Sequence, residues 1–262
     1  MGILNVTPDS FSDGGKFDST DSAVAQALKL QAEGADIIDI GGESTRPYSQ
    51  AVTTEQELQR VIPVIEKLAR QIEIPISIDT SKAQVAEQAI AAGAEIINDV
   101  TGLQGDPAMV SVAIESGAGV CAMHMQGTPQ DMQDNPSYQD VVEEIFSYLK
   151  SRRTCLLDAG IKEENICLDP GIGFGKTHQH NLQLMNQVSR FLELGSPILV
   201  GHSRKGFIRK ATGDESSERI AGTLAASLHL AAAGVHIIRV HDILETRQAI
   251  KMQQAIHSIS IK

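Results

Sequence analysis

The chain has 262 residues, of which 33 are acidic and 22 are lysine or arginine, so its formal net charge is −11. This length accommodates one large domain or two small ones, and α/β barrels commonly reach it as a single unit. The acidic balance argues against a nucleic-acid or membrane-surface protein, because such proteins usually meet phosphate groups with a basic face.

Cysteine usage and the absence of a targeting pattern indicate a reducing compartment. Cys121, Cys155 and Cys167 form no Cys-x-x-Cys motif, and no basic-then-apolar leader precedes Gly2. We therefore expect a cytoplasmic protein. The most apolar window, residues 220–238, is rich in alanine and contains two histidines, which favours a buried helix and a strand over a membrane span.

A repeated pattern runs along the chain, in which a segment of helical periodicity reaches a glycine and a short β-branched strand follows. Such a glycine can supply the left-handed residue that ends a helix. The clearest copies of this pattern place strands within residues 34–40, 93–99, 117–123 and 234–240. Short apolar runs at residues 1–4, 76–78, 166–168 and 198–200 bring the candidate strands to eight. The segments between the strands predict helices at residues 22–33, 54–70, 82–92, 108–116, 138–159, 181–194, 218–233 and 244–257.

Eight units of strand and helix predict a closed (β/α)8 TIM barrel, since near-continuous apolar strands are typical of parallel sheets covered on both faces. A doubly wound open sheet is the alternative. Because no linker or low-complexity run divides the units, we expect one domain over residues 1–262.

A polar residue ends every predicted strand, at what would be the C-terminal mouth of a barrel. A polar side chain beside apolar strands costs free energy unless something pairs with it, and barrel enzymes build their active sites at this mouth. The strand ends are Asn5, Asp39, Asp79, Asn98, His124, Asp169, Ser203, and Arg239 with His241.

A glycine-rich stretch, residues 168–177, follows the sixth strand. It does not fit a nucleotide P-loop, because Pro170 stands where that motif needs its first glycine, and it lacks the third glycine of a Rossmann fingerprint. Its glycines allow close approach of a ligand to the backbone. The loops at residues 5–15 and 41–47 carry hydroxyls, charge and glycine, as active-site lids do.

Together these stretches resemble the dihydropteroate synthase family of pterin-binding enzymes. The matching segments span the chain in order, at residues 1–15, 39–47, 78–80, 97–99, 123–127, 169–177, 203–205 and 239–242. The resemblance implies a (β/α)8 barrel and a transferase of folate biosynthesis that is a sulfonamide target. Its reaction joins p-aminobenzoate to 6-hydroxymethyl-7,8-dihydropterin pyrophosphate, giving 7,8-dihydropteroate and pyrophosphate.

The resemblance also implies the residues that bind the pterin and carry out catalysis. Asp79, Asn98 and Asp169 would accept hydrogen bonds from the pterin ring, and Lys205 would donate to its acceptors. Asp79 would also stabilise positive charge that develops as the C–O bond breaks. Asp79, Lys205 and Arg46 are thus the expected catalytic residues.

The pyrophosphate would be held by Arg239 and His241, which alternate along the last strand and so share a face. Arg46 and Thr45 of the second loop would close over it. The family implies Mg²⁺ as cofactor, with Asn5 as its protein ligand and phosphate oxygens completing the shell.

The p-aminobenzoate would be bound by side chains from the loops and the seventh strand end. These are Phe11, Thr45, Pro47, Phe174, Ser203 and Lys205. Relatives usually carry glycine where Tyr48 stands, so this side chain changes the path of the second loop. The family is commonly dimeric through its later helices, and we expect a homodimer.

Two rival functions share parts of this pattern. A methyltetrahydrofolate–corrinoid methyltransferase would use the same three acceptors, but it would not need the set at residues 203–205, the loop at 45–47 or the Arg239 and His241 pair. A non-catalytic pterin-binding paralogue would be expected to lose Lys205 or the first loop, and this chain keeps both.

Overall fold

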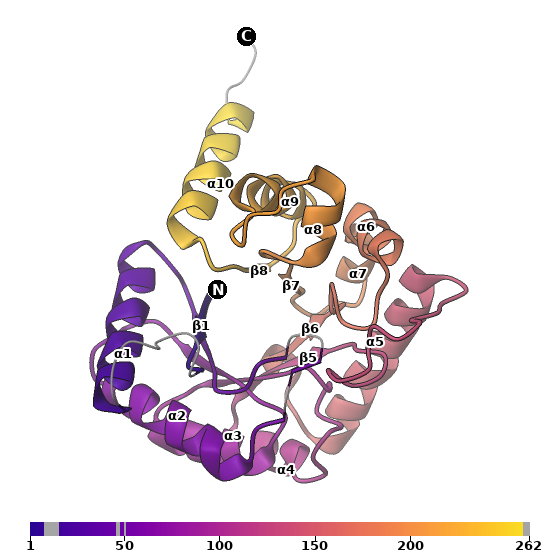
Figure 1. Ribbon diagram of the computed structural model, residues 1–262. Coiled ribbons are helices and arrows are strands. Elements are labelled where there is room, and N and C mark those ends of the chain that lie inside the picture. Colours follow the sequence, from indigo (N-terminus) through magenta and orange to yellow (C-terminus); the bar gives the residue numbers. More distant parts are fainter. Residues whose placement is uncertain (8–15, 46–47, 50, 259–262) are drawn as a thin grey trace.

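A computed structural model of the chain describes residues 1–7, 16–45, 48–49 and 51–258 (Figure 1). Within these residues eight parallel strands alternate with helices. The strands are β1 (Gly2–Asn5), β2 (Ile38–Gly41), β3 (Ile76–Asp79), β4 (Ile96–Asp99), β5 (Gly119–Met123), β6 (Ile166–Asp169), β7 (Leu199–Gly201) and β8 (Ile237–Arg239).

The helices surround the strands on the outside (Figure 1). They are α1 (Lys16–Ala32), α2 (Thr54–Leu68), α3 (Ala83–Ala92), α4 (Met109–Ser116), α5 (Val141–Ala159), α6 (His178–Asn186), α7 (Ser189–Leu192), α8 (Gly206–Thr212), α9 (Ile220–Ala232), α10 (Ile243–His257) and the short 3-10 helix η2 (Glu163–Asn165). Among the described helices, none is long and apolar enough to cross a membrane.

The strands close into a ring, which confirms the predicted (β/α)8 barrel over the open sheet. β1 to β6 form one parallel sheet and β7 pairs with β8. Parallel bridges join the two groups at both seams, between Gly2 and Val240 and between Leu168 and Ile198. Backbone hydrogen bonds hold the seams, from Ile3 N to Val240 O at 3.0 Å and from Leu168 N to Pro197 O at 2.9 Å.

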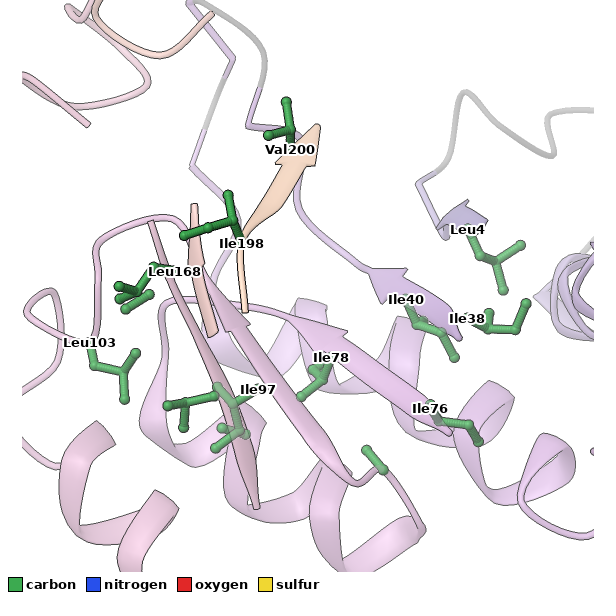
Figure 2. Packing of buried hydrophobic residues seen from close by; sticks show 14 of the residues in the cluster. Leu4, Ile38, Ile40, Ile76, Ile78, Ile97, Leu103, Leu168, Ile198 and Val200 are labelled. Atoms are coloured by element: carbon green, nitrogen blue, oxygen red, sulfur yellow. The ribbon is translucent and has the colours of Figure 1, made fainter. Parts of the chain in front are cut away.

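Alternation along each strand sorts the side chains into two environments. Outward-facing residues such as Leu4, Ile40, Ile78 and Ile97 are almost fully buried in the main apolar core, which they share with the helices (Figure 2). A second apolar cluster, separate from the first, comprises Met1, Cys121 and Leu199, with Ile37, Cys167 and Ile237 packed on it. The polar strand-end residues alternate with the outward-facing ones, so they belong to the interior of the ring.

The sequence predicted the order of elements better than their bounds. Gly93 has φ +118° and caps α3, as the helix-glycine-strand pattern predicts. The predicted helix at 181–194 is instead two helices, because Gln187 leaves helical backbone angles between Asn186 and Val188, which are weak helix formers. The pattern missed α8 and η2, which are too short for a periodic signal.

Candidate active site

Three of the predicted site residues, Asn5, Asp79 and Asn98, lie in one row across neighbouring strands. The register pairs Asn5 with Gly41, Gly41 with Asp79, and Asp79 with Asn98. Asp169 ends β6 and Arg239 ends β8, so both also belong to the carboxyl edge of the barrel. Because Gly41 has no side chain, the row leaves space between the amide of Asn5 and the carboxylate of Asp79.

Arg239 lies at the centre of a network of ion pairs across this mouth. Its Nε donates to Asp39 Oδ2 at 2.5 Å and its Nη2 donates to Asp79 Oδ2 at 2.7 Å. Asn98 Nδ2 donates to the same Asp39 oxygen at 3.1 Å. Asp39 is fully buried, so it fixes both the guanidinium and the amide.

Asp39 was a polar strand end in the sequence, but nothing there assigned it a role in the site. Its partners lie 59 and 200 residues away along the chain. The signal that could have found it is the barrel itself, because closure places the ends of β2 and β8 across the same mouth.

Burial raises the pKa of the Asp79 carboxyl to about 7, although the nearby Arg239 guanidinium lowers it. Burial likewise raises the pKa of Asp169, against the hydrogen bond that Gly171 N donates to its Oδ1 at 2.7 Å. Both carboxyls therefore hold a proton more readily than an exposed aspartate does. Carboxyl oxygens buried at this mouth suit a ligand that is rich in N–H donors.

Lys205 precedes α8 and reaches into the glycine-rich loop. Its Nζ donates to Ile172 O and lies 4.4 Å from the centroid of the Phe174 ring. Burial lowers the pKa of Lys205 to about 8. A Cβ on Gly173 would lie 2.9 Å from Lys205 Cδ, so the absence of a side chain at 173 lets the ammonium and the ring approach each other.

The glycine-rich loop packs tightly against the segment that follows β5. At Gly171, with φ +70°, a Cβ would lie 1.9 Å from His124 O. Gln133 Nε2 donates to Gly173 O at 2.8 Å, and Tyr138 OH donates to Gly175 O at 2.8 Å. The sequence analysis explained the glycines by contact with a ligand, and the structure adds that they let the loop pack on the end of β5.

Ser203 and His241 contact each other, which connects two predicted subsites. His241 Nδ1 lies 3.0 Å from Ser203 Oγ, and the His241 backbone N–H donates to the same oxygen at 3.3 Å. Ser203 is buried. The residue predicted for the p-aminobenzoate carboxylate and one predicted for the pyrophosphate are therefore neighbours.

Three predicted residues, Phe11, Arg46 and Pro47, lie outside the described part of the chain. Thr45 is half-buried at the start of the second loop. On the far side of that loop Tyr48 has φ +62°, a left-handed conformation that favours glycine. Its hydroxyl donates to Asp134 Oδ1 at 3.0 Å and its N–H donates to Pro129 O at 3.0 Å. Tyr48 thereby ties the second loop to the segment after β5.

Lys176 is a buried cation that the sequence analysis did not assign. Its Nζ lies 3.1 Å from His124 Nδ1 and donates to Phe174 O at 2.8 Å. Burial lowers the pKa of Lys176, and burial together with this cation lowers the pKa of His124 to about 3. His124 is therefore neutral and accepts from Lys176, which links the end of β5 to the glycine-rich loop.

Among the described residues, no group of three histidine, cysteine or acidic side chains could hold a metal ion. The amide oxygen of Asn5 is a hard oxygen donor of the kind that Mg²⁺ accepts. A single amide fits a metal whose other ligands come from a phosphate-bearing substrate and water.

Comparisons with known proteins agree with this site. A family model described as pterin binding enzyme matches residues 1–241. The dihydropteroate synthase of Clostridium beijerinckii is 48% identical over 257 residues, which cover 98% of this chain and 93% of that protein. The chain belongs to the dihydropteroate synthase family. This confirms the resemblance predicted from the sequence.

Solved structures of dihydropteroate synthases share the fold. The Xanthomonas albilineans enzyme with 4-aminobenzoic acid has a TM-score of 0.94 at 46% identity, covering 99% of this chain and 93% of that one. The Yersinia pestis enzyme with a sulfonamide drug has a TM-score of 0.93 at 43% identity, covering 99% and 94%. Membership in the dihydropteroate synthase family makes the chain an enzyme, a transferase, as predicted.

Proposed function

We propose that the chain joins the aniline nitrogen of p-aminobenzoate to the methylene carbon of 6-hydroxymethyl-7,8-dihydropterin pyrophosphate. The products are 7,8-dihydropteroate and pyrophosphate. The observation that carries this proposal is the convergence of Asp79, Asn98, Asp169 and Lys205 on one barrel mouth. The match to relatives named for this reaction supports it.

The pterin ring would be read by oxygens that the protein's own contacts leave available. Asn98 gives its amide N–H to Asp39 and so presents its Oδ1. Asp79 uses Oδ2 with Arg239, and Asp169 uses Oδ1 with Gly171. In each carboxylate the other oxygen can accept from the N–H-rich edge of the ring.

Lys205 and Asp79 would each contribute electrostatically to catalysis, Lys205 as a donor to the ring and Asp79 as a stabiliser of positive charge. Lys205 donates to the acceptor side of the ring and balances the aspartates. As the bond from the methylene carbon to the pyrophosphate oxygen breaks, positive charge spreads into the ring, and an ionised Asp79 stabilises it. We favour this dissociative order, in which the amine of p-aminobenzoate adds afterwards and loses its proton.

The departing pyrophosphate would be bound by Arg239 and His241, with Thr45 and Arg46 from the second loop. Arg239 engages two carboxylates through Nε and Nη2, while its Nη1 takes part in neither contact. The pyrophosphate could first accept a hydrogen bond from Arg239 Nη1 and then draw the guanidinium away from the aspartates. Asn5 would contribute the protein ligand of a Mg²⁺ that neutralises charge on the leaving phosphates.

The p-aminobenzoate would lie between the glycine-rich loop and the second loop. Phe174, half-buried over Lys205, offers a ring face, and Ser203 offers a hydroxyl to the carboxylate. Thr45, Phe11 and Pro47 would complete the subsite. Because Ser203 also contacts His241, we expect p-aminobenzoate to bind best once the pyrophosphate end is occupied.

We further propose one domain over residues 1–262, a cytoplasmic location and a homodimer. The free thiols of Cys121, Cys155 and Cys167 suit a reducing compartment. For the dimer, α9 exposes small residues and the neighbouring α10 exposes large apolar ones. These are Ala221, Ala225 and Ala232 on α9, and Leu244, Met252 and Ile256 on α10.

The test is release of pyrophosphate from the dihydropterin pyrophosphate and Mg²⁺, with and without p-aminobenzoate. We expect release that depends on p-aminobenzoate, an equal amount of dihydropteroate, and loss of both with EDTA. Lys205→Met should abolish turnover, while the exposed Lys67→Met should not. Binding of the pterin without turnover would instead identify a non-catalytic paralogue.

A further inference from the structure

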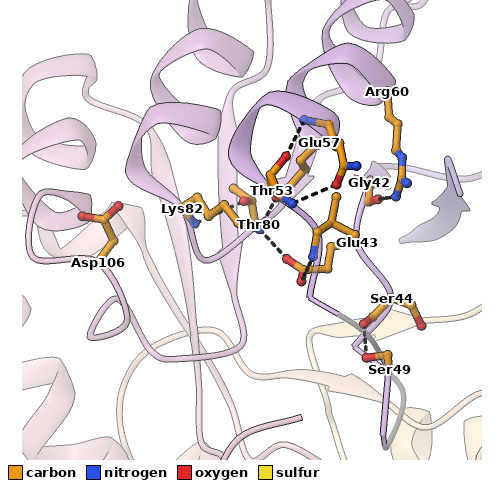
Figure 3. A network of polar contacts seen from close by, with 12 residues as sticks. Gly42, Glu43, Ser44, Ser49, Thr53, Glu57, Arg60, Thr80, Lys82 and Asp106 are labelled. Carbon is orange, nitrogen blue, oxygen red and sulfur yellow. Dashed lines mark hydrogen bonds and ion pairs between the residues drawn. The ribbon is translucent and has the colours of Figure 1, made fainter. Parts of the chain in front are cut away.

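Outside the network at the mouth, Lys82 joins two carboxylates from different elements (Figure 3). Its Nζ donates to Glu43, which follows β2, and to Glu57 of α2. Glu57 is fully buried and only about a quarter of the Lys82 side chain is exposed, at 23%. Burial lowers the pKa of Lys82, but its bonds with both carboxylates outweigh burial and leave that pKa raised. Removing one partner of such a buried ion pair strongly destabilises the other, which is left as an uncompensated buried charge.

The local sequence leaves the Lys82 side chain free to reach this position. Lys82 occupies the N-cap position of α3 but makes no side-chain cap there. Asp106, from beyond β4, accepts from Ala83 N at 2.9 Å and satisfies that helix end instead. Thr80 Oγ1 accepts from Lys82 N at 3.2 Å and holds the turn that begins at Asp79.

Glu43 closes the base of the second loop. One carboxylate oxygen accepts from Val52 N at 2.9 Å, while the other accepts from Lys82. Inside the loop, Ser49 Oγ donates to Ser44 O. The Glu43 side chain, which Lys82 holds, therefore joins the two ends of the segment that contains Thr45, at residues 43 and 52.

Gly42, which immediately precedes this segment, packs closely against α2. A Cβ on Gly42 would lie 2.8 Å from Val61 Cγ1 and 3.0 Å from Glu57 Cγ, and Arg60 Nη1 donates to Gly42 O at 2.7 Å. The backbone before the loop is therefore fixed, and the Lys82 contact fixes the direction in which the loop leaves it.

We propose that Lys82 is a positioning residue for the p-aminobenzoate subsite: through Glu43 it sets the base of the loop that carries Thr45, and Glu57 fixes the ammonium. This inference rests on the proposed function. The pterin acceptors Asp79, Asn98 and Asp169 are instead held by Arg239, Asp39 and the Gly171 N–H, respectively. Loss of Lys82 should therefore weaken the binding of p-aminobenzoate and leave the binding of the pterin unchanged.

The test measures both substrates in Lys82→Met, Lys82→Arg and the control Lys67→Met, whose exposed ammonium pairs with Asp21. We expect Lys82→Met to raise KM for p-aminobenzoate by about tenfold or more, the size of effect typical of a lost positioning contact. The dissociation constant of the pterin pyrophosphate should change less than about twofold. Lys82→Arg should restore most of the affinity, and Lys67→Met should behave as wild type.

Lys82→Met leaves the Glu57 carboxylate buried without its partner and so endangers folding. The double variant Glu57→Gln/Lys82→Met removes that buried charge and should fold while still lacking the anchor of Glu43. It should show the same rise in KM for p-aminobenzoate. An unchanged KM in this folded variant, or equal losses for both substrates, would overturn the proposal.

Amide hydrogen exchange at Val52 tests the anchor independently of catalysis. Exchange at Val52 N–H should speed up in the double variant, while the similar bond from Leu103 N to Asp99 Oδ2, at 3.1 Å, should keep its rate. If the wild type makes no dihydropteroate, the proposed reaction fails while this measurement still decides the anchor. Unchanged Val52 exchange would refute the anchor even in an active synthase.

Discussion

At the scale of single residues, the mouth combines burial with charge. Asp39, Asp79 and Asp169 face the cations Arg239 and Lys205, and burial is the largest cause of the shifted pKa values of Asp79, Asp169 and Lys205. Asp79 carries the clearest consequence for stability, because its carboxyl titrates near neutral pH.

Replacing Asp79 by asparagine should stabilise the folded protein at high pH while abolishing turnover. The folded-state pKa, about 7, lies above the unfolded value of 3.8. The contribution of the protonated carboxyl is therefore fully present below pH 3.8 and is lost as pH rises through 7. Asparagine mimics the protonated carboxyl. The free energy of unfolding of the variant should therefore rise relative to that of wild type over this pH range, by at most about 4 kcal/mol.

Urea unfolding of both proteins from pH 4 to pH 8 checks this expectation, with Asp21→Asn as an exposed control. The difference in unfolding free energy between Asp79→Asn and wild type should widen with pH. A difference that narrows would show that the ion pair with Arg239 outweighs burial.

At the scale of elements, the loops after the strands are held by particular contacts. The glycine-rich loop is fixed by steric fit at Gly171 and by Lys176, whereas the second loop is held through Glu43 and Tyr48. The first kind of restraint tolerates no added atom, and the second depends on individual side chains.

Gly171→Ala should destabilise the fold far more than Gly195→Ala. Both glycines have positive φ, +70° and +74°, so both variants bear the same backbone strain, about 1 kcal/mol. At Gly195 an added Cβ meets no atom within 4 Å, whereas at Gly171 it lies 1.9 Å from His124 O. We expect a further loss of about 2 kcal/mol or more at 171. Thermal and urea unfolding of the two variants measures it, and equal losses would show that the loop can shift.

Sequence patterns recovered what is local and missed what depends on closure. The helix-glycine-strand repeat and the short apolar runs together located all eight strands, because each signal is contained in a few residues, such as those around Gly93. The role of Asp39 and the anchor at Lys82 escaped, because their partners are distant in the chain. Even the resemblance, which named Asp79, Asn98, Asp169 and Lys205, said nothing of what holds them. Their substrate roles remain predictions.

At the scale of the whole molecule, the proposed dimer makes the exposed face of α9 and α10 the natural contact. Ala225 is exposed in the middle of α9, with Ala221 and His229 one turn away on either side. We expect Ala225→Arg to convert a dimer into a monomer in sedimentation experiments, because a buried charge without a partner opposes association. Ala91→Arg, at an exposed position of α3, is the control. A wild-type monomer, or a dimer unaffected by Ala225→Arg, would remove this surface from consideration.

The shared oxygen of Asp39 has a consequence for how the two ends of one substrate communicate. Arg239, proposed for the phosphates, and Asn98, proposed for the ring, both donate to Asp39 Oδ2. A phosphate that draws Arg239 away leaves that oxygen to Asn98 alone, which strengthens the hold on the amide. The coupling between two binding sites is reciprocal. Binding of the pterin ring should therefore strengthen binding of the phosphates by the same factor by which the phosphates strengthen binding of the ring. Separate pterin and pyrophosphate fragments should then bind with positive cooperativity, although neither touches the other.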